Sequence, residues 1–473
     1  MSSDADLDRQ RDALRPFEEA EAALVRSVVS APAWISEADE AALRYALNLA
    51  RVGRLPAPGG GEVDLGPALA PFREEVRAAA LPALLARGGP ERAEAVRLAS
   101  GLRLRARVFR SLAVRAAEGR LPPAAVDREV CEKALVVVAG GGGGVVWSYL
   151  GAFALLEHYG LAPRLLAGTS MGAVLLLFRA RRARWHADDV DRAVSGLSFR
   201  SLFRFLRADA RYGLPAALRL YLRTAIGDFL RGPDGEPLTL GQLPVPLLVA
   251  VTGIRPGALP RDPSYYEHLL DLPDPGAGAL SRMLTEAFRA VGELLVQRDR
   301  FARIYLGADE ETRAFDAVDA VGFSSALPGV IHYDVLREDE RMHRLLAGLL
   351  ERHGVSRLVD GGLVDNLPAR AAWGLVQRGS LGTRNAFVLG LEGFGPKLSQ
   401  PLWFGLGQLA AQNVARNRPF VHLHRSFQRV LSPVEIVPSA DQRRRAIQEG
   451  KAELHPDMPF LARMVRPFAP PPA

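Results

Sequence analysis

Two glycine-dependent turns carry the residue types of a nucleophilic site. A run of five glycines, Gly140 to Gly144, follows the apolar stretch Leu135 to Val138. Such a turn can direct backbone N–H groups at an oxygen that becomes an anion. Ser170 lies in the second turn, Gly168-Thr169-Ser170-Met171-Gly172, and a serine hydroxyl attacks acyl carbon when a base takes its proton. The pattern predicts acyl hydrolysis with Ser170 as nucleophile and the amides of Gly141, Gly142, Gly143 and Gly144 as the oxyanion hole.

The glycines around Ser170 suit a sharp turn from a strand into a helix. Gly168 and Gly172 have no side chain where such elements crowd together, so the chain can bend at the serine. Between the two turns there is room for one helix, about Val146 to Tyr159, and one strand, about Leu165 to Gly168. We therefore expect both turns to end neighbouring parallel strands at the edge where open α/β sheets bind ligands.

Asp360 is the predicted general base for Ser170. It ends the apolar pair Leu358-Val359 and leads into Gly361-Gly362, so its carboxylate stands at a strand end with clear backbone around it. Aspartate is also common in turns for structural reasons. Asp365, inside the following turn, is the second choice.

A Ser-Asp-His triad is the alternative. Nine histidines are available for it: His158, His186, His268, His332, His343, His353, His422, His424 and His455. His422 and His424 follow Asp360 and so allow the chain order of α/β-hydrolases, but their alternation with Val421 and Leu423 is also typical of an edge strand. The 27 residues that separate Gly143 from Ser170 (170 minus 143) are too few for the oxyanion loop of that fold, which favours the dyad.

A flexible loop and a dinucleotide phosphate cradle are the other interpretations of the glycine run. A Gly-x-Gly-x-x-Gly cradle needs an acidic residue about twenty positions on to bind a ribose. Glu157 instead falls inside the first predicted helix. The dyad scheme requires no cofactor and no metal, and no calcium-loop spacing is seen.

The sequence pattern changes near Glu132, and the helices and strands that must position these residues follow it. Beyond it, uncharged apolar runs alternate with helix-length segments, as in a sheet with helices on both faces. These runs are Leu135 to Val138, Leu165 to Ala167, Leu247 to Val251 and Phe387 to Leu391. We therefore predict an α/β sandwich around a mostly parallel sheet.

Before about residue 130, the spacing of apolar residues predicts several helices that are separated by interruptions. Ser36 and Asp39 form a helix-opening pattern, and apolar residues recur at helical spacing from about Ser36 to Arg54 and again from about Pro90 to Glu118. We expect a helical accessory region over 1–130, the α/β domain over 131–395 and a mostly helical extension, packing on that core, over 396–473.

The segment from Ser198 to Arg231 mixes large apolar residues with seven arginines. Two interpretations stay open. It can be a helical pair packed on the sheet with its arginines in solvent, which we favour, or it can lie on an anionic lipid interface and cover an acyl pocket.

Composition narrows the class of protein. The 473 residues are 48% hydrophobic, which is enough for a large core. The single cysteine, Cys131, excludes an internal disulfide and a multi-cysteine metal site. The first fifteen residues lack a signal-peptide pattern, so a cytoplasmic location is expected. The uncharged stretch Ala134 to Leu156 is long enough for a membrane span, but five consecutive glycines argue against a continuous helix.

Charge indicates possible partners. The net charge of +7 and the pI near 9.8 favour an anionic surface such as a membrane. No zinc-finger or ribonucleoprotein pattern is present, so nucleic acid is not expected. The sequence does not determine the oligomeric state.

Five ordered segments resemble the patatin-like phospholipase family. They comprise Gly141-Gly142-Gly143 with the helix through Gly151, Gly168 to Ala173, Leu243 to Leu247, Ser324 to Gly329 and Val359 to Pro368. The resemblance covers roughly Glu132 to Leu391. It implies a three-layer α/β/α sandwich and a serine acyl hydrolase with Ser170 as nucleophile, Asp360 as base and the glycine amides as oxyanion hole. It also implies a lipid ester substrate of the phospholipid or lysophospholipid class.

One position departs from the family pattern. The family's three glycines are usually followed by any residue, an arginine or lysine, and a glycine, whereas this chain has Gly144, Val145 and Val146. The missing cation predicts weaker oxyanion stabilisation. A non-catalytic member that binds lipid or protein is therefore the rival hypothesis.

Overall fold

The computed structural model describes residues 4–470 except 118, 196, 206–209, 258–299, 336 and 395–400. The chain forms two compact units that interleave along the sequence. One comprises Met1–Leu135, Trp373–Phe387 and Pro456–Ala473, and the other comprises Val136–Ala372 and Val388–His455. The division at residues 130 and 395 stays a prediction about the chain's domains.

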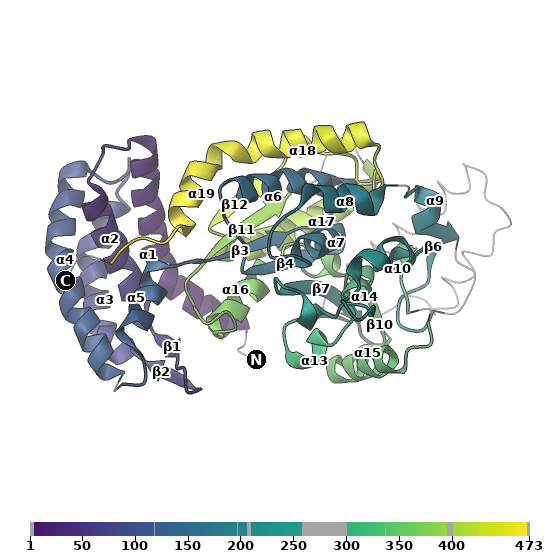
Figure 1. The fold of residues 1–473 in the computed structure, drawn as a ribbon, viewed down its shortest axis with the longest axis horizontal. Coiled ribbons are helices and arrows are strands. Elements are labelled where there is room, and N and C mark those ends of the chain that lie inside the picture. The colour runs from purple at the N-terminus through teal and green to yellow at the C-terminus, as the bar shows by residue number, and fades with distance from the viewer. Residues whose placement is uncertain are drawn as a thin grey trace. The chain divides into compact units, whose positions relative to one another are not determined.

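The first unit is mainly helical (Figure 1). Its elements are α1 (Asp4–Ser30), α2 (Glu37–Arg51), β1 (Arg54–Pro56), β2 (Glu62–Asp64), α3 (Gly66–Leu84), α4 (Arg92–Ala116), α5 (Pro123–Cys131) and α19 (Met458–Val465). The Ser36 side chain accepts a hydrogen bond from the Asp39 amide and so begins α2, as the sequence predicts. One apolar core runs between these helices and includes Phe17, Tyr45 and Phe72.

The second unit is built on a seven-stranded sheet, and the predicted three-layer α/β/α fold is confirmed. The sheet strands are β3 (Ala134–Ala139), β4 (Leu165–Thr169), β7 (Leu247–Ile254), β8 (Phe301–Leu306), β10 (Arg357–Asp360), β11 (Ala386–Glu392) and β12 (Leu423–Ser426). The order is β10-β7-β4-β3-β11-β12, with β8 also paired to β7. β12 ends this order, so the predicted edge strand around His424 is confirmed.

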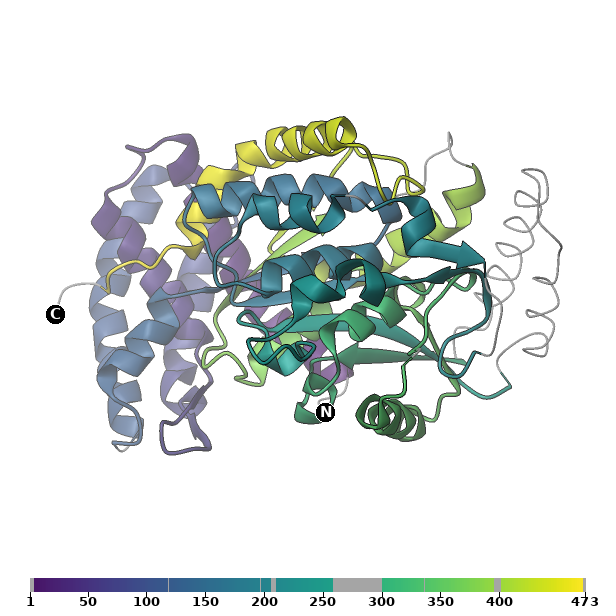
Figure 2. The ribbon, with the colours of Figure 1, turned by 45° about the vertical axis from the view of Figure 1, so that its right-hand side comes forward.

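Helices and short turns connect and cover this sheet. They are η1 (Gly143–Ser148), α6 (Tyr149–His158), α7 (Ser170–Ala180), α8 (Ala187–Val194), η3 (Leu240–Gln242), α13 (Glu310–Arg313), α14 (Ala317–Ser324), α15 (Glu340–His353), η5 (Gly361–Leu363), α16 (Ala369–Gln377), α17 (Pro401–Asn417), η6 (Arg418–Phe420), α18 (Ala440–Leu454) and η7 (His455–Asp457). In Figures 1 and 2, α18 lies along α6. A side chain on Gly151 of α6 would meet the backbone of Gly450 of α18 at 2.9 Å, which shows how closely the two helices pack.

The favoured helical pair between Ser198 and Arg231 is wrong. The described residues form α9 (Phe199–Leu202), β5 (Phe203–Phe205), β6 (Ala216–Leu220), α10 (Leu222–Ile226) and η2 (Gly227–Leu230). β6 pairs with β5 and with β9 (Gly329–His332) in a second, three-stranded sheet. The partner β9 lies over a hundred residues away, so tertiary pairing overrides local helical spacing here.

Among the described residues, none of the helices combines the length and apolar character that crossing a bilayer requires. The uncharged stretch Ala134 to Leu156, weighed as a span, instead forms β3, the glycine loop, η1 and most of α6.

Candidate active site

Ser170 occupies a strained turn between β4 and α7. Its φ of 53° is the one positive value found outside glycine in the described part of the chain, and such a backbone costs energy that the surroundings must offset. A side chain on Gly168 would lie 2.7 Å from Leu176 Cδ1, and one on Gly172 would lie 2.9 Å from the Ala139 carbonyl. Both positions therefore require glycine, because a side chain would clash with the neighbouring element, as the sequence predicts.

Ser324 at the end of α14 holds this turn in place. Its hydroxyl accepts the Ser170 amide proton at 2.8 Å and donates to the Ala250 carbonyl of β7 at 2.6 Å. Ser324 is fully buried. The strained serine is thus tied through one hydroxyl to β7, a role of Ser324 that the sequence did not reveal.

The register on β7 brings Asp360 to Ser170. β4 runs parallel to β7 and pairs Thr169 with Ala250, whereas β10 runs antiparallel and pairs Asp360 with Val251. β8 pairs with β7 from Val249 to Ile254, so β4 and β10 must share the opposite edge of β7. The two strands meet end to end there, and Asp360 comes next to the residue before Ser170.

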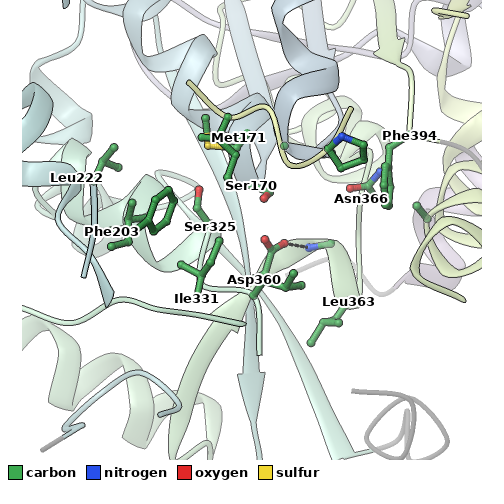
Figure 3. A pocket seen from close by; sticks show the side chains of 18 of the residues that line it. Ser170, Met171, Phe203, Leu222, Ser325, Ile331, Asp360, Leu363, Asn366 and Phe394 are labelled. Atoms are coloured by element: carbon green, nitrogen blue, oxygen red, sulfur yellow. Dashed lines mark hydrogen bonds between the residues drawn. The ribbon is translucent and has the colours of Figure 1, made fainter. Parts of the chain in front are cut away.

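The carboxylate of Asp360 is enclosed and faces the serine hydroxyl (Figure 3). The side chain is 6% exposed, and its Oδ1 accepts the Gly362 amide proton at 2.7 Å. Burial raises its pKa from 3.8 to about 6, against the opposing effect of hydrogen bonds from the Ser170 hydroxyl and the Gly362 N–H. A carboxyl group with this pKa is ionised at neutral pH and still takes up a proton readily.

Some amides of the glycine run donate hydrogen bonds within the protein, and others have no partner in the described structure, which we call open amides. The Gly141 amide donates to Asn366 Oδ1 at 3.1 Å, and the Gly144 amide donates to the Pro433 carbonyl at 3.1 Å. Within the described residues, the amides of Gly142 and Gly143 have no hydrogen-bond partner, and both glycines line the pocket at Ser170. The predicted oxyanion donors Gly141 and Gly144 are thus already bonded, which leaves Gly142 and Gly143.

Asn366 is a second residue whose role the sequence did not reveal. Its Oδ1 fixes the Gly141 amide, while its Nδ2 is buried and makes no hydrogen bond within the described structure. Asn366 also lines the pocket beside Ser170. An unused donor in this position can bind an oxygen of a substrate.

An apolar pocket opens in front of the serine and the carboxylate (Figure 3). Leu222, Phe203 and Ile331 lie on one side of Ser170, and Phe394 lies on the other. Further apolar side chains also line the pocket: Leu202, Leu220, Leu327, Leu363, Leu409 and Ile436. The pocket is suited to a hydrocarbon chain rather than to a charged group.

Comparison with known proteins places this site in a family. The model of the patatin-like phospholipase family matches residues 136–373, which is half of the chain. The chain belongs to the patatin-like phospholipase family. The family is generally one of lipid hydrolases, and Ser170, Asp360 and the glycine run all lie inside the matched residues. No curated protein matches the chain closely enough to be compared with it.

A segment outside the match to the patatin-like family completes the pocket. Residues 432–436, which we call the C-terminal strap, follow β12 and lie against the glycine run. A side chain on Gly143 would meet the Pro433 backbone, with its Cα at 3.1 Å. Trp147 Nε1 donates to the Ile436 carbonyl at 3.2 Å, and Pro433 and Ile436 line the pocket. The strap therefore holds the glycine run of this patatin-like protein in place through backbone contacts.

Val145, where patatin-like proteins usually carry a cation, is 2% exposed. It packs against Gly393, whose added side chain would lie 2.7 Å from Val145 Cγ1. An apolar contact and the strap thus hold the loop at the position where an arginine or lysine is usual.

The competing candidates for the base lie elsewhere in this patatin-like fold. Asp365 is buried, and burial raises its pKa to about 6, but its two oxygens accept hydrogen bonds from Tyr305 at 2.7 Å and Asn417 at 2.8 Å. No described histidine lines the pocket. His422 Nδ1 accepts the Val388 amide proton at 2.9 Å in the sheet, and His268 lies outside the described residues.

Proposed function

We propose that this protein hydrolyses a carboxylic ester of a lipid, as a phospholipase A or lysophospholipase, with Ser170 and Asp360 as its catalytic dyad. The observation that carries the proposal is the buried Asp360 carboxylate facing the hydroxyl of the strained Ser170, beside the open amides of Gly142 and Gly143.

In the proposed reaction, the hydroxyl oxygen of Ser170 attacks the ester carbonyl while Asp360 takes the hydroxyl proton. The Gly142 and Gly143 amides then donate hydrogen bonds to the oxyanion, and the alcohol leaves with a proton from Asp360. Water attacks the acyl-enzyme with Asp360 again as base, which releases the fatty acid and restores the serine. The apolar pocket receives the acyl chain.

Labelling and hydrolysis together test the proposal. A fluorophosphonate should modify Ser170, and the protein should release fatty acid from phospholipid or lysophospholipid. Ser170→Ala should abolish labelling, and both Ser170→Ala and Asp360→Ala should lower hydrolysis by several powers of ten. Ser325→Ala is a matched control, because Ser325 also lines the pocket but its hydroxyl donates to the Val321 carbonyl at 2.9 Å. Near-normal turnover in either dyad variant would falsify the dyad.

A non-catalytic lipid-binding role is the second candidate. It is favoured by the buried Val145 in the usual cation position and by the strap that occupies the Gly144 amide. A folded protein that binds lipid, never reacts with fluorophosphonate and hydrolyses no ester would support this role instead.

Peripheral contact with an anionic membrane is a further part of the proposed function. Phe199 on α9 is 49% exposed, and its ring lies 4.8 Å from that of Phe203, which lines the pocket. Arg200 is exposed beside it. An exposed aromatic ring with neighbouring cations suits the interfacial layer of a bilayer.

A further inference from the structure

The helical unit contains a large polar cavity that the proposed reaction does not use. The cavity has a volume of about 740 Å³, within the range of small-molecule sites. Its charged lining consists of five arginines and two glutamates: Arg51, Arg54, Arg73, Arg378, Arg384, Glu62 and Glu129. The lining thus has more positive than negative groups, although Asp64 lies 3.8 Å from Arg54 and Glu18 lies 3.8 Å from Arg51 just outside it.

Arg51 is the most enclosed of these cations. Its side chain is 8% exposed, and its two terminal nitrogens donate to Asn48 Oδ1 and Asn385 Oδ1, each at 3.0 Å. Both acceptors are neutral amides. The one carboxylate within ion-pair distance, Glu18, lies 3.8 Å away, and the Arg51 Nε has no hydrogen-bond partner in the described structure. A buried guanidinium held mainly by neutral groups attracts an anion.

Arg73 and Arg378 add two charges without carboxylate partners. Arg73 donates to the backbone carbonyls of Ala50 at 2.7 Å and Val52 at 2.9 Å. The Arg378 guanidinium makes no hydrogen bond or ion pair to any residue that the structure describes. Burial lowers the pKa of both groups, as expected for cations with no neutralising contact.

The two carboxylates of the lining are bound to Arg384 and Thr383 and not to the other arginines of the cavity. Glu62 pairs with Arg384. Glu129 accepts from the Thr383 hydroxyl at 2.7 Å and from the Arg384 amide at 3.0 Å, and burial raises its pKa, which favours its neutral form. Neither carboxylate forms an ion pair with Arg51, Arg73 or Arg378 in the described structure.

We propose that this cavity binds a small polar molecule that carries phosphate groups. Guanidinium forks match phosphate oxygens in pairs, and several arginines around one cavity suit a di- or polyphosphate. The uncharged apolar side chains of the lining are Ala13, Leu14 and Val52, too few to enclose a hydrocarbon tail. The ligand is therefore bound through its phosphate and polar parts, independently of the ester chemistry at Ser170.

Calorimetric titration of the full-length protein at low ionic strength tests this site. Sodium pyrophosphate should bind with one-to-one saturation, more tightly than inorganic phosphate and more tightly than citrate. Binding should weaken as salt increases. Absence of saturable pyrophosphate binding, or tighter binding of citrate, would overturn the assignment.

Two variants locate the binding in the cavity. Arg378→Ala removes a side chain that has no polar partner in the described structure, and it should weaken pyrophosphate binding about tenfold without altering the melting temperature. Arg87→Ala removes the same charge from an exposed position of the same unit outside the cavity, and should change the affinity less than twofold. Equal losses in the two variants would mean a diffuse charge effect and refute the site.

Vesicles separate the two sources of a phosphate group. Phosphatidylcholine vesicles with and without phosphatidic acid are sedimented with wild type and Arg378→Ala. Arg378-dependent binding to the anionic vesicles identifies a lipid headgroup, whereas pyrophosphate binding without such vesicle binding identifies a free metabolite. Either result supports the phosphate site, because both depend on the same guanidinium.

Discussion

Replacing Asp360 with asparagine should stabilise the protein while abolishing its activity. Burial raises the pKa of this carboxyl group from 3.8 to about 6. The unfolded chain holds the ionised group in water, whereas the folded protein holds it in an apolar pocket. Since one pKa unit corresponds to about 1.4 kcal/mol, the ionised carboxylate costs the folded state about 3 kcal/mol.

The direction of the pH dependence follows from the raised pKa. Between about pH 4 and 6 the folded protein keeps a proton that the unfolded chain has lost, so the contribution of Asp360 to stability falls as the pH rises through this window. Above pH 6 the full cost is present. Asp360→Asn retains an oxygen for the Gly362 amide and removes the charge. The variant should therefore exceed wild type by up to about 3 kcal/mol at pH 7 to 8, with little difference near pH 4.

The same pKa should govern catalysis. A base is active when deprotonated, so kcat/KM should rise with pH and level off above about pH 6. At pH 5 about a tenth of the molecules carry the ionised base, and the rate should fall to about a tenth of its plateau. Asp360→Asn should lose several powers of ten at every pH.

Urea unfolding from pH 4 to pH 8 checks the predicted stability difference, and fatty-acid release over the same range checks the predicted pH dependence of the rate. Asp365→Asn is the control, because burial raises the pKa of Asp365 to about 6 as well, but its oxygens bond to Tyr305 and Asn417 outside the pocket. That variant should leave the midpoint of the rate profile near 6. A rate midpoint near 4, or a stability gain from Asp360→Asn that does not change with pH, would refute the reasoning.

Four further outcomes are expected. Ser324→Ala should lower stability by about 1–2 kcal/mol in urea unfolding and kcat by at least tenfold, because the Ser170 amide loses its acceptor. Asn366→Ala should reduce kcat about tenfold to a hundredfold with KM little changed, because the Gly141 amide loses its partner; an effect confined to KM would contradict this. Gly144→Ala should displace the strap, lower the melting temperature by several degrees and expose the strap to proteolysis, because its side chain would meet the Glu435 backbone. Phe199→Ser should weaken sedimentation with anionic vesicles and leave hydrolysis of short soluble esters unchanged; equal binding by wild type and variant would count against membrane contact.

The sequence predicted those parts of the site that depend on neighbouring residues. β3 and β4 are short, uncharged and followed by glycine turns, so their parallel pairing and the place of Ser170 could be foreseen and are confirmed by the register. The four main apolar runs all form strands of the sheet. Local crowding at Gly168 and Gly172 also follows from residue type alone.

The pairing register between strands that lie far apart in the sequence could not be predicted from the sequence alone. Asp360 comes beside the serine turn because β10 runs antiparallel on the same edge of β7 as β4, and nothing in Leu358-Val359 specifies that direction. Ser324 acts through its hydroxyl and the strap acts through two backbone carbonyls, and such contacts leave no recognisable pattern of residue types. The error between Ser198 and Arg231 has the same origin, because β6 depends on the distant β9.

The strap gives a physical reason why the glycine loop tolerates a valine in the usual cation position. A cation near the loop would contribute charge, but an oxyanion hole also requires amides that are already oriented before the reaction. Here the Gly141 amide is bound to Asn366 and the Gly144 amide to Pro433, so the two bonded ends hold Gly142 and Gly143 between them. The open amides therefore need little reorganisation when an oxyanion forms. On this argument the chain replaces part of the electrostatic contribution with rigidity. Asn366, which holds one end of the loop, lies inside the matched family segment, whereas residues 432–436, which hold the other end, lie outside it.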